Sequence, residues 1–331
     1  MNKALLIINL GSPRNSDKDS VKQFLSEFLN DKYVIDIPYI ARKILVNGII
    51  IPKRLDHSTS LYKQLFSNDE SPIVKHTKTL CRKLNESIRD TDTFFAMRYG
   101  NFSIEDVLNN INKKGYKDIT ILPLYPQYAD STSRSTIKEV IRISKKWDDS
   151  IKIRIINEFY TNSLFIKAIG EKIKKHNHNK YDKILFSYHA LPMRHIKKMH
   201  NRNKHLICSC TNNSINNGEL CYLAACYKTS NLLAKYLNLD KNSYTTSFQS
   251  RMSKNWTKPF TSETIIDFAN NHIKKILVVS PSFVCDCLET TIELQKDAKE
   301  LFISNGGEKL DLVENLNSDD LWVDAIADII K

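Results

Sequence analysis

The sequence predicts an α/β protein with two similar Rossmann-like lobes, each a parallel sheet flanked by helices, and a cleft between the lobes. Short apolar runs rich in β-branched residues alternate with helical patterns, which is typical of chains that form mostly parallel sheets. The chain has 331 residues, which is enough for two cores of ordinary size. Folds of this class bind their ligands where strand ends meet, so we expect functional side chains there.

A weak internal repeat supports the two lobes. The segment 6–13 resembles 185–192, and 119–130 resembles 276–286, because each is a buried strand that runs into a polar loop. We expect the boundary between the lobes near residue 160.

The two predicted lobes, 1–160 and 161–331, differ in their insertions. The first carries extra residues between its repeat segments, and the apolar segment 33–55 is the candidate for a loop that forms a lip over the site. The second carries a cysteine-bearing insert at 200–226 and ends in a helix.

The individual elements follow from the same patterns. Strands are expected at Ala4–Asn9, Thr93–Arg98, Ile119–Leu124, Lys152–Asn157, Lys183–Tyr188, Ser243–Gln249 and Lys275–Ser280. Helices are expected at Ser20–Leu29, Pro72–Ser87, Ile104–Lys114, Thr132–Lys145, Ser163–Lys175 and Leu288–Asn305. Ser20 is the expected N-cap of the first helix. Pro192 and Pro281 lie near the ends of two strands, where proline closes a strand.

The composition excludes several classes of function. The net charge of +12 comes from lysines scattered along the chain among abundant Asn and Ile, so we attribute it to a general sequence bias and expect no nucleic-acid partner. There are only 8 Gly, and both common glycine-rich phosphate-binding motifs are absent. No apolar run approaches the ~20 residues that span a bilayer, and the N-terminus lacks the features of a signal peptide. We therefore expect a cytoplasmic protein.

His189 and Glu289 each follow a buried apolar strand. An imidazole and a carboxylate that converge from two strand ends can bind a divalent metal, transfer protons, or both. Each also has a structural interpretation, as a hydrogen-bonded histidine and as a carboxylate stabilised by a helix dipole. Glu293 and Asp297 continue from Glu289 at spacings of four, which places like charges on one helix face. Such a stripe requires solvent or a cation, or it leads away from a metal or a protonated base.

Aromatic and cationic side chains follow other predicted strands. Arg98 and Tyr99 end one strand, Tyr125 lies just after the next, and 247–251 adds a third polar strand end. Arginine favours carboxylates, and tyrosine can flank a flat ring. Together these side chains predict a cleft that suits a planar, acid-bearing ligand.

Four of the 7 cysteines are close together in the sequence: Cys208, Cys210, Cys221 and Cys226. In a cytoplasmic chain such a cluster favours iron–sulfur or zinc ligation over disulfides. The spacing is not that of a standard zinc knuckle, so a cluster, zinc or no metal all stay open. The remaining cysteines are interpreted as structural thiols.

Taken together, these residues resemble the ferrochelatase family, over nearly the whole chain. The family's blocks occur in order, and they lie at 9–13, 96–100, 124–128, 186–192, 247–251 and 286–290. Gly306-Gly307 and Leu316-Asn317 resemble its C-terminal signature. Two departures are Ala190, where glycine is usual, and Phe102, where proline is common.

The resemblance implies a chelatase-like fold and a lyase of heme biosynthesis that inserts ferrous iron into protoporphyrin IX to form protoheme. It implies that His189 is a metal ligand and an acceptor of a pyrrole proton, with Glu289 as its partner acid. Glu293 and Asp297 would continue as a proton or metal path. Arg98, Tyr99 and Tyr125 fall on positions used around the macrocycle. Some members of the family carry a [2Fe-2S] cluster on such a cysteine insert.

Alternatives concern the substrate and the partners. A coproporphyrin chelatase is the rival within the class, although the apolar segment 33–51 favours the less polar ring. A tetrapyrrole-binding protein without turnover is the rival from another class, but a mere binder needs no pair such as His189 and Glu289. The segment 37–51 is either a lip over the site or a peripheral contact with the inner face of the membrane. A monomer and a homodimer are equally compatible with the sequence.

Overall fold

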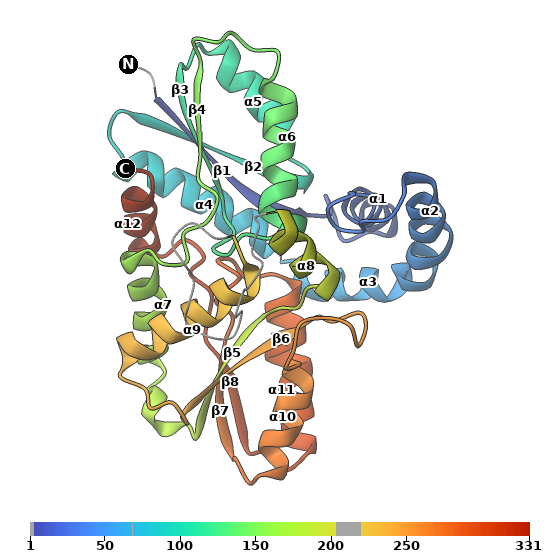
Figure 1. Ribbon diagram of the computed structural model, residues 1–331, viewed down its shortest axis with the longest axis vertical. Helices are drawn as coiled ribbons and strands as arrows, with labels where there is room; N and C mark the ends of the chain where they lie inside the picture. The colour runs from blue at the N-terminus through green and yellow to red at the C-terminus, as the bar shows by residue number, and fades with distance from the viewer. Residues whose placement is uncertain (1–2, 68, 203–219) are drawn as a thin grey trace. The chain divides into compact units, whose positions relative to one another are not determined.

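The computed structural model describes residues 3–67, 69–202 and 220–331 and divides into two compact units (Figure 1). The N-terminal unit comprises Met1–Tyr125, Ala129–Glu158 and Ile330–Lys331. The C-terminal unit comprises Pro126–Tyr128 and Phe159–Ile329. Each contains a four-stranded parallel sheet covered by helices, as the fold class predicted from the sequence requires.

The sheet of the N-terminal unit has the strand order β2-β1-β3-β4. Its strands are β1 (Lys3–Ser12), β2 (Thr91–Gly100), β3 (Asp118–Pro123) and β4 (Lys152–Ile155). Central strand β1 is buried on both faces, which explains its almost continuous apolar sequence. Leu6 and Ile8 face one core cluster, and on the other face Asn9 donates to Thr77 at 3.1 Å.

Helices cover both faces of this sheet, with α4 on one side and α5 and α6 on the other (Figure 1). The helical segments of the unit are α1 (Lys18–Leu29), α2 (Tyr39–Lys43), η1 (Ile44–Ile50), α3 (Ile51–Leu65), α4 (Pro72–Ser87), α5 (Ile104–Lys113), η2 (Asp130–Arg134) and α6 (Ser135–Ser144). The group α1–α3 projects to one side and has a small core of its own, which includes Val21, Val46 and Leu55.

The sheet of the C-terminal unit has the corresponding order β6-β5-β7-β8. Its strands are β5 (Lys183–His189), β6 (Tyr244–Gln249), β7 (Lys275–Val279) and β8 (Lys309–Leu312). Its helical segments are α7 (Ser163–Lys175), η3 (His178–Lys180), α8 (Met193–Arg202), α9 (Tyr222–Leu237), α10 (Thr261–Asn270), η4 (Glu289–Asp297), α11 (Ala298–Ser304) and α12 (Asp320–Ile329). Apolar residues of α10, η4 and α11 form the core on one face of the sheet.

The structure contains all seven strands that the sequence predicts, and it adds β8. The segment of β8 has only four residues and alternates Lys, Leu, Asp and Leu, so its apolar content is too small for a strand prediction. The segment Tyr33–Leu55, which we expected to be a loop, is instead helical from Tyr39 onward. Its helices form because Val46, Ile51 and Leu55 pack against α1, a tertiary contact that local composition does not reveal.

The predicted N-cap of the first helix is wrong. Helix α1 begins at Lys18 and is capped by Asp17, whose carboxylate accepts the backbone N–H of Ser20 at 2.9 Å and its hydroxyl at 2.8 Å. Ser20 therefore lies in the first turn and donates to the cap instead of forming it.

Two predicted helices begin as π-helices. The helix expected at Thr132–Lys145 is η2 followed by α6, and the one expected at Leu288–Asn305 is η4 followed by α11. Hydrophobic periodicity does not distinguish a π-turn from an α-turn within so short a run, and π-turns are frequent at functional sites.

Candidate active site

His189 is the last residue of β5, and its neighbour in the sheet register is Gln249 of β6. The ring atom Nδ1 lies 2.6 Å from the carbonyl oxygen of Ala190. Because a carbonyl oxygen only accepts, Nδ1 carries the proton of the neutral ring, and Nε2 is left as the basic atom. The imidazole is half-buried. Its ring centroid lies 6.5 Å from that of Trp256 and 6.3 Å from that of Phe283.

Hydrogen bonds also fix the backbone of His189. Its carbonyl oxygen accepts the hydroxyl of Tyr222 at 2.7 Å, and its N–H donates to Ser282 at 3.3 Å. Tyr222 is the first residue of α9, directly after Cys221. The start of α9 thus fixes the main chain at the histidine.

Glu289 is the first residue of η4 and is half-buried. Its carbonyl oxygen accepts the side-chain N–H of Gln249 at 2.8 Å. Burial raises the pKa of the neighbouring Cys287 thiol well above its usual value, and the charge of Glu289 raises it further. Cys287 therefore stays protonated at neutral pH.

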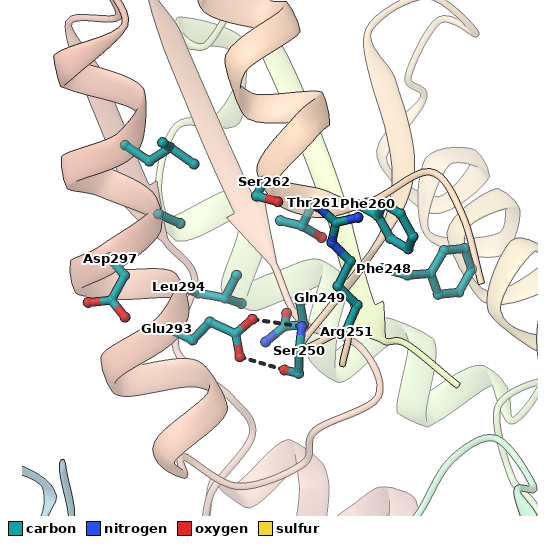
Figure 2. Close-up of a pocket in the computed structure, with 12 residues that line it drawn as sticks. Phe248, Gln249, Ser250, Arg251, Phe260, Thr261, Ser262, Glu293, Leu294 and Asp297 are labelled. Atoms are coloured by element: carbon teal, nitrogen blue, oxygen red, sulfur yellow. Dashed lines mark hydrogen bonds between the residues drawn. The ribbon is translucent and has the colours of Figure 1, made fainter. Parts of the chain in front are cut away.

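Glu293 lies one turn further along η4 and faces a pocket of about 310 Å³ (Figure 2). Its carboxylate accepts the backbone N–H of Ser250 at 2.7 Å and also the hydroxyl of Ser250. Burial raises the pKa of Glu293; the Ser250 hydrogen bonds and the nearby His189 oppose this, whereas the charge of Glu289 adds to it. Glu293 therefore lies within electrostatic range of both His189 and Glu289.

The acidic stripe ends at Asp297, which is exposed and lines the same pocket. Figure 2 shows Glu293 and Asp297 on the same helix, with Ser250 opposite Glu293. Across the pocket, the guanidinium of Arg251 lies 3.9 Å from the ring centroid of Phe260 and pairs with Glu263 at 3.0 Å. The carboxylates thus extend from the surroundings of His189 to solvent.

The three residues predicted around the macrocycle, Arg98, Tyr99 and Tyr125, belong to the N-terminal unit. Arg98 and Tyr99 both donate to one carboxylate oxygen of Asp31, each at 2.8 Å. Arg98 also donates to Ser135 at 2.8 Å. The side chain of Asp31 is only 6% exposed, so this is a largely buried ion pair. Burial and the Asp31 charge raise the pKa of Tyr99, which therefore stays protonated and able to donate.

Tyr125 is also buried, and burial raises the pKa of its hydroxyl, whereas the charge of Arg98 lowers it. Gly11 holds the end of β1 close to β2, since a Cβ at this glycine would collide with the carbonyl oxygen of Tyr99. The sequence did not identify Asp31, which precedes the segment 33–55 and has no motif of its own.

The four-cysteine cluster is only partly described. Cys208 and Cys210 lie outside the described residues. Cys221 is buried at the start of α9, with its sulfur 3.1 Å from Nε2 of His200, and Cys226 is buried on α9. Within 3–67, 69–202 and 220–331, no three His, Cys, Asp or Glu side chains form a group that could hold a metal ion.

Comparison with solved structures identifies the class of fold. The sirohydrochlorin chelatase SirB from Bacillus subtilis subspecies spizizenii, in complex with cobalt, superposes with a TM-score of 0.56 at 11% identity, over 100% of this chain and 94% of that one. SirB from Bacillus subtilis with Fe3+ gives 0.55 at 11% identity, over 99% and 96%. The fold is that of the chelatases.

Comparison with known sequences identifies the family. The ferrochelatase family model matches residues 2–331. The ferrochelatase of Legionella pneumophila strain Paris is 39% identical over 100% of this chain and 99% of the relative, and that of Pseudomonas fluorescens is 36% identical over 99% and 97%. The chain belongs to the ferrochelatase family. It is a lyase-type metal chelatase that inserts ferrous iron into protoporphyrin in heme biosynthesis.

Proposed function

We propose that His189 and Glu289 are the catalytic residues of this iron insertion. The observation that carries the proposal is the hydrogen bond between His189 Nδ1 and the Ala190 carbonyl, because it makes Nε2 the basic atom of the ring. Glu293 interacts electrostatically with both His189 and Glu289, and we propose that the two carboxylates share the protons.

The reaction requires both a metal relay and a base. Four iron–nitrogen bonds form as two inner N–H bonds of the porphyrin break and the iron gives up its previous ligands, and the iron stays ferrous. We propose that Nε2 of His189 and a carboxylate oxygen of Glu289 ligate the arriving iron. As the iron passes to the ring nitrogens, the same two groups take up the pyrrole protons.

Glu293 and Asp297 are proposed to carry these protons to solvent. Because burial raises the pKa of Glu293, its carboxylate binds a proton more readily than an exposed glutamate does. Asp297 is exposed at the outer end of the stripe and can pass the proton to water. Iron can travel the same carboxylates in the opposite direction.

Arg98, Tyr99 and Tyr125 are proposed to bind around the macrocycle. Protoporphyrin IX is the expected substrate in preference to coproporphyrin, because α2 and η1 expose apolar side chains, among them Ile40 at 72% and Ile44 at 63%. The additional carboxylates of coproporphyrin would gain little from a surface that is mostly apolar.

Anaerobic turnover with ferrous iron tests these assignments. We expect a higher kcat/KM for protoporphyrin IX than for coproporphyrin, and we expect His189→Ala to abolish insertion while porphyrin binding is largely retained. The matched control is His176→Ala, a substitution in the same unit at the end of α7. Wild-type turnover by His189→Ala would defeat the mechanism.

A second candidate property is peripheral contact with a membrane at the cytoplasmic face. Its observation is the exposed apolar group Tyr39, Ile40, Ile44 and Ile49, which borders the basic Lys43. Apolar side chains beside a basic residue suit the interface of an anionic bilayer. None of the described helices is long and apolar enough to cross a membrane.

Metal binding by the four-cysteine segment stays a prediction. A [2Fe-2S] cluster or a zinc ion would require Cys208 and Cys210 in addition to Cys221 and Cys226. Protein purified anaerobically is expected to carry iron with acid-labile sulfide, or zinc. Metal and sulfide at background levels would contradict metal binding by the four cysteines.

A further inference from the structure

Gln249, the last residue of β6, forms hydrogen bonds next to both proposed catalytic residues. Its backbone bonds to the neighbour of His189, and its side chain bonds to Glu289. Its backbone carbonyl oxygen accepts the N–H of Ala190 at 2.8 Å. The carbonyl of the same Ala190 residue is the one that fixes Nδ1 of His189. The main chain of Gln249 therefore helps to hold the group that sets the tautomer of the histidine.

The side chain of Gln249 reaches the other residue of the pair. Its Oε1 accepts the hydroxyl of Ser187 at 2.7 Å, and its Nε2 donates to the carbonyl oxygen of Glu289 at 2.8 Å. A carbonyl oxygen cannot donate, so the amide has only this orientation: nitrogen toward Glu289 and oxygen toward Ser187.

This amide is the end of a buried chain of hydrogen bonds. Ser187 lies 2.8 Å from the hydroxyl of Thr261, which lies 2.8 Å from that of Ser247. All four side chains are at most 3% exposed. Because these polar groups are shielded from water, breaking one bond leaves a buried polar group without its partner, which is unfavourable.

Two consecutive residues attach the sheet to η4: the last residue of β6 and the residue that follows it. Gln249 holds the carbonyl of Glu289, and Ser250 holds the carboxylate of Glu293. Ser250 has φ +62°, a backbone conformation that most side chains avoid and that a firm tertiary contact maintains. The strand that pairs with the His189 strand is thus bonded directly to the helix that carries the carboxylates.

We propose that Gln249 is a positioning residue that fixes the distance between His189 and Glu289. It touches neither substrate nor iron in this role, which rests on the catalytic roles proposed above. A misplacement of a reacting group by about 1 Å can cost roughly a hundredfold in rate. Release of the Glu289 carbonyl should therefore lower turnover more than it lowers porphyrin binding.

The first test is Gln249→Met, which keeps the volume of the side chain and removes both hydrogen bonds. We expect kcat to fall at least about tenfold while KM for the porphyrin stays within about twofold. The control is Thr246→Val on the same strand, which removes a buried hydrogen bond to Ser230 of 2.8 Å on the other face of the sheet. This control should lose a similar amount of thermal stability and keep its kcat.

The second test is Gln249→Glu, whose outcome does not depend on how well the methionine variant folds. A protonated glutamic acid accepts from Ser187 and donates to the Glu289 carbonyl, whereas the ionised form cannot donate. We therefore expect the kcat of Gln249→Glu, divided by that of the wild type, to rise as pH falls. The same ratio for Gln249→Met should not depend on pH.

The outcomes separate this inference from the proposed function. If Gln249→Met retains wild-type kcat, or Gln249→Glu shows no gain at low pH, Gln249 is not a positioning residue, even when His189→Ala is inactive. If His189→Ala and Glu289→Gln turn over normally, the proposed catalytic roles fail and this inference fails with them.

Discussion

Ser250 donates two hydrogen bonds, from its backbone N–H and from its hydroxyl, to the carboxylate of Glu293. They stabilise the ionised form against a burial that favours the protonated form, and burial is the larger effect. The balance sets the pH at which the carboxylate can receive a proton.

Ser250→Ala is expected to shift the pH dependence of turnover. The substitution removes the hydroxyl donor and keeps the N–H, so the pKa of Glu293 rises further. Because Glu293 accepts protons only when ionised, the acid limb of the kcat profile should move to higher pH. The measurement is kcat for iron insertion across the pH range. Ser304→Ala, which removes an exposed hydroxyl of α11, serves as the control, and an unmoved acid limb would contradict the proton path.

Glu293→Gln is expected to stabilise the protein at neutral pH. A carboxyl whose pKa is raised by folding contributes stability that is fully present below its unfolded pKa and is lost as pH rises through its folded pKa. The ionised Glu293 therefore opposes folding at neutral pH, and glutamine removes this cost. Thermal melts should show a higher Tm than the wild type at pH above the folded pKa. The gain should shrink toward pH 4, and the opposite trend would sink the assignment.

Asp31→Ala is expected to destabilise the N-terminal unit and to weaken porphyrin binding. It leaves the guanidinium of Arg98, 18% exposed, without the carboxylate that it now contacts, at a cost of roughly 3 kcal/mol. Tyr99 loses the same acceptor, so the KM for the porphyrin should rise. Denaturant unfolding and steady-state kinetics measure the two effects.

The control for Asp31→Ala is Arg82→Ala, because Arg82 and Glu86 form an exposed ion pair in the same unit. Such pairs contribute little, about 0.3–0.5 kcal/mol. Equal losses of stability in the two variants would show that the buried Arg98–Asp31 pair contributes no more to stability than the exposed pair.

Ile40→Asp combined with Ile44→Asp is expected to abolish binding to anionic vesicles. The two side chains are among the most exposed apolar groups of the described residues, and carboxylates there would be repelled by the lipid headgroups. Co-sedimentation with vesicles of phosphatidylserine and phosphatidylcholine measures the effect. Ile303→Asp, at an exposed apolar position of α11, is the control. Equal sedimentation of the double variant and the wild type would remove α2 and η1 as the contact.

The sequence was sufficient for seven of the eight strands of the described residues and for the position of His189 at the end of one of them, because both depend on local patterns. An apolar run such as 183–188 predicts a buried strand, and a polar residue at its end predicts a site. The contact of Asp31 with Arg98 and the contact of Gln249 with Glu289 could not be predicted in this way. The first joins residues 67 positions apart in the chain, and the second joins residues 40 positions apart. The helical segments η1 and α3 were missed for a similar reason, since their buried apolar residues pack against α1 and not against a sheet.

In each unit, a π-helix follows the third strand in chain order. It is η2 after β3 in the N-terminal unit and η4 after β7 in the C-terminal unit. In η2, Asp130 pairs with Arg134 at 3.2 Å, so its negative charge is neutralised within one turn. In η4, Glu289, Glu293 and Asp297 occupy the widened turns, and Glu293 meets only the neutral donors of Ser250 in its hydrogen bonds. The same backbone distortion therefore follows the corresponding strand of both sheets, with different electrostatics. The two units thus share the position of the turn and differ in its charge, which is an ion pair in η2 and a stripe of three carboxylates in η4.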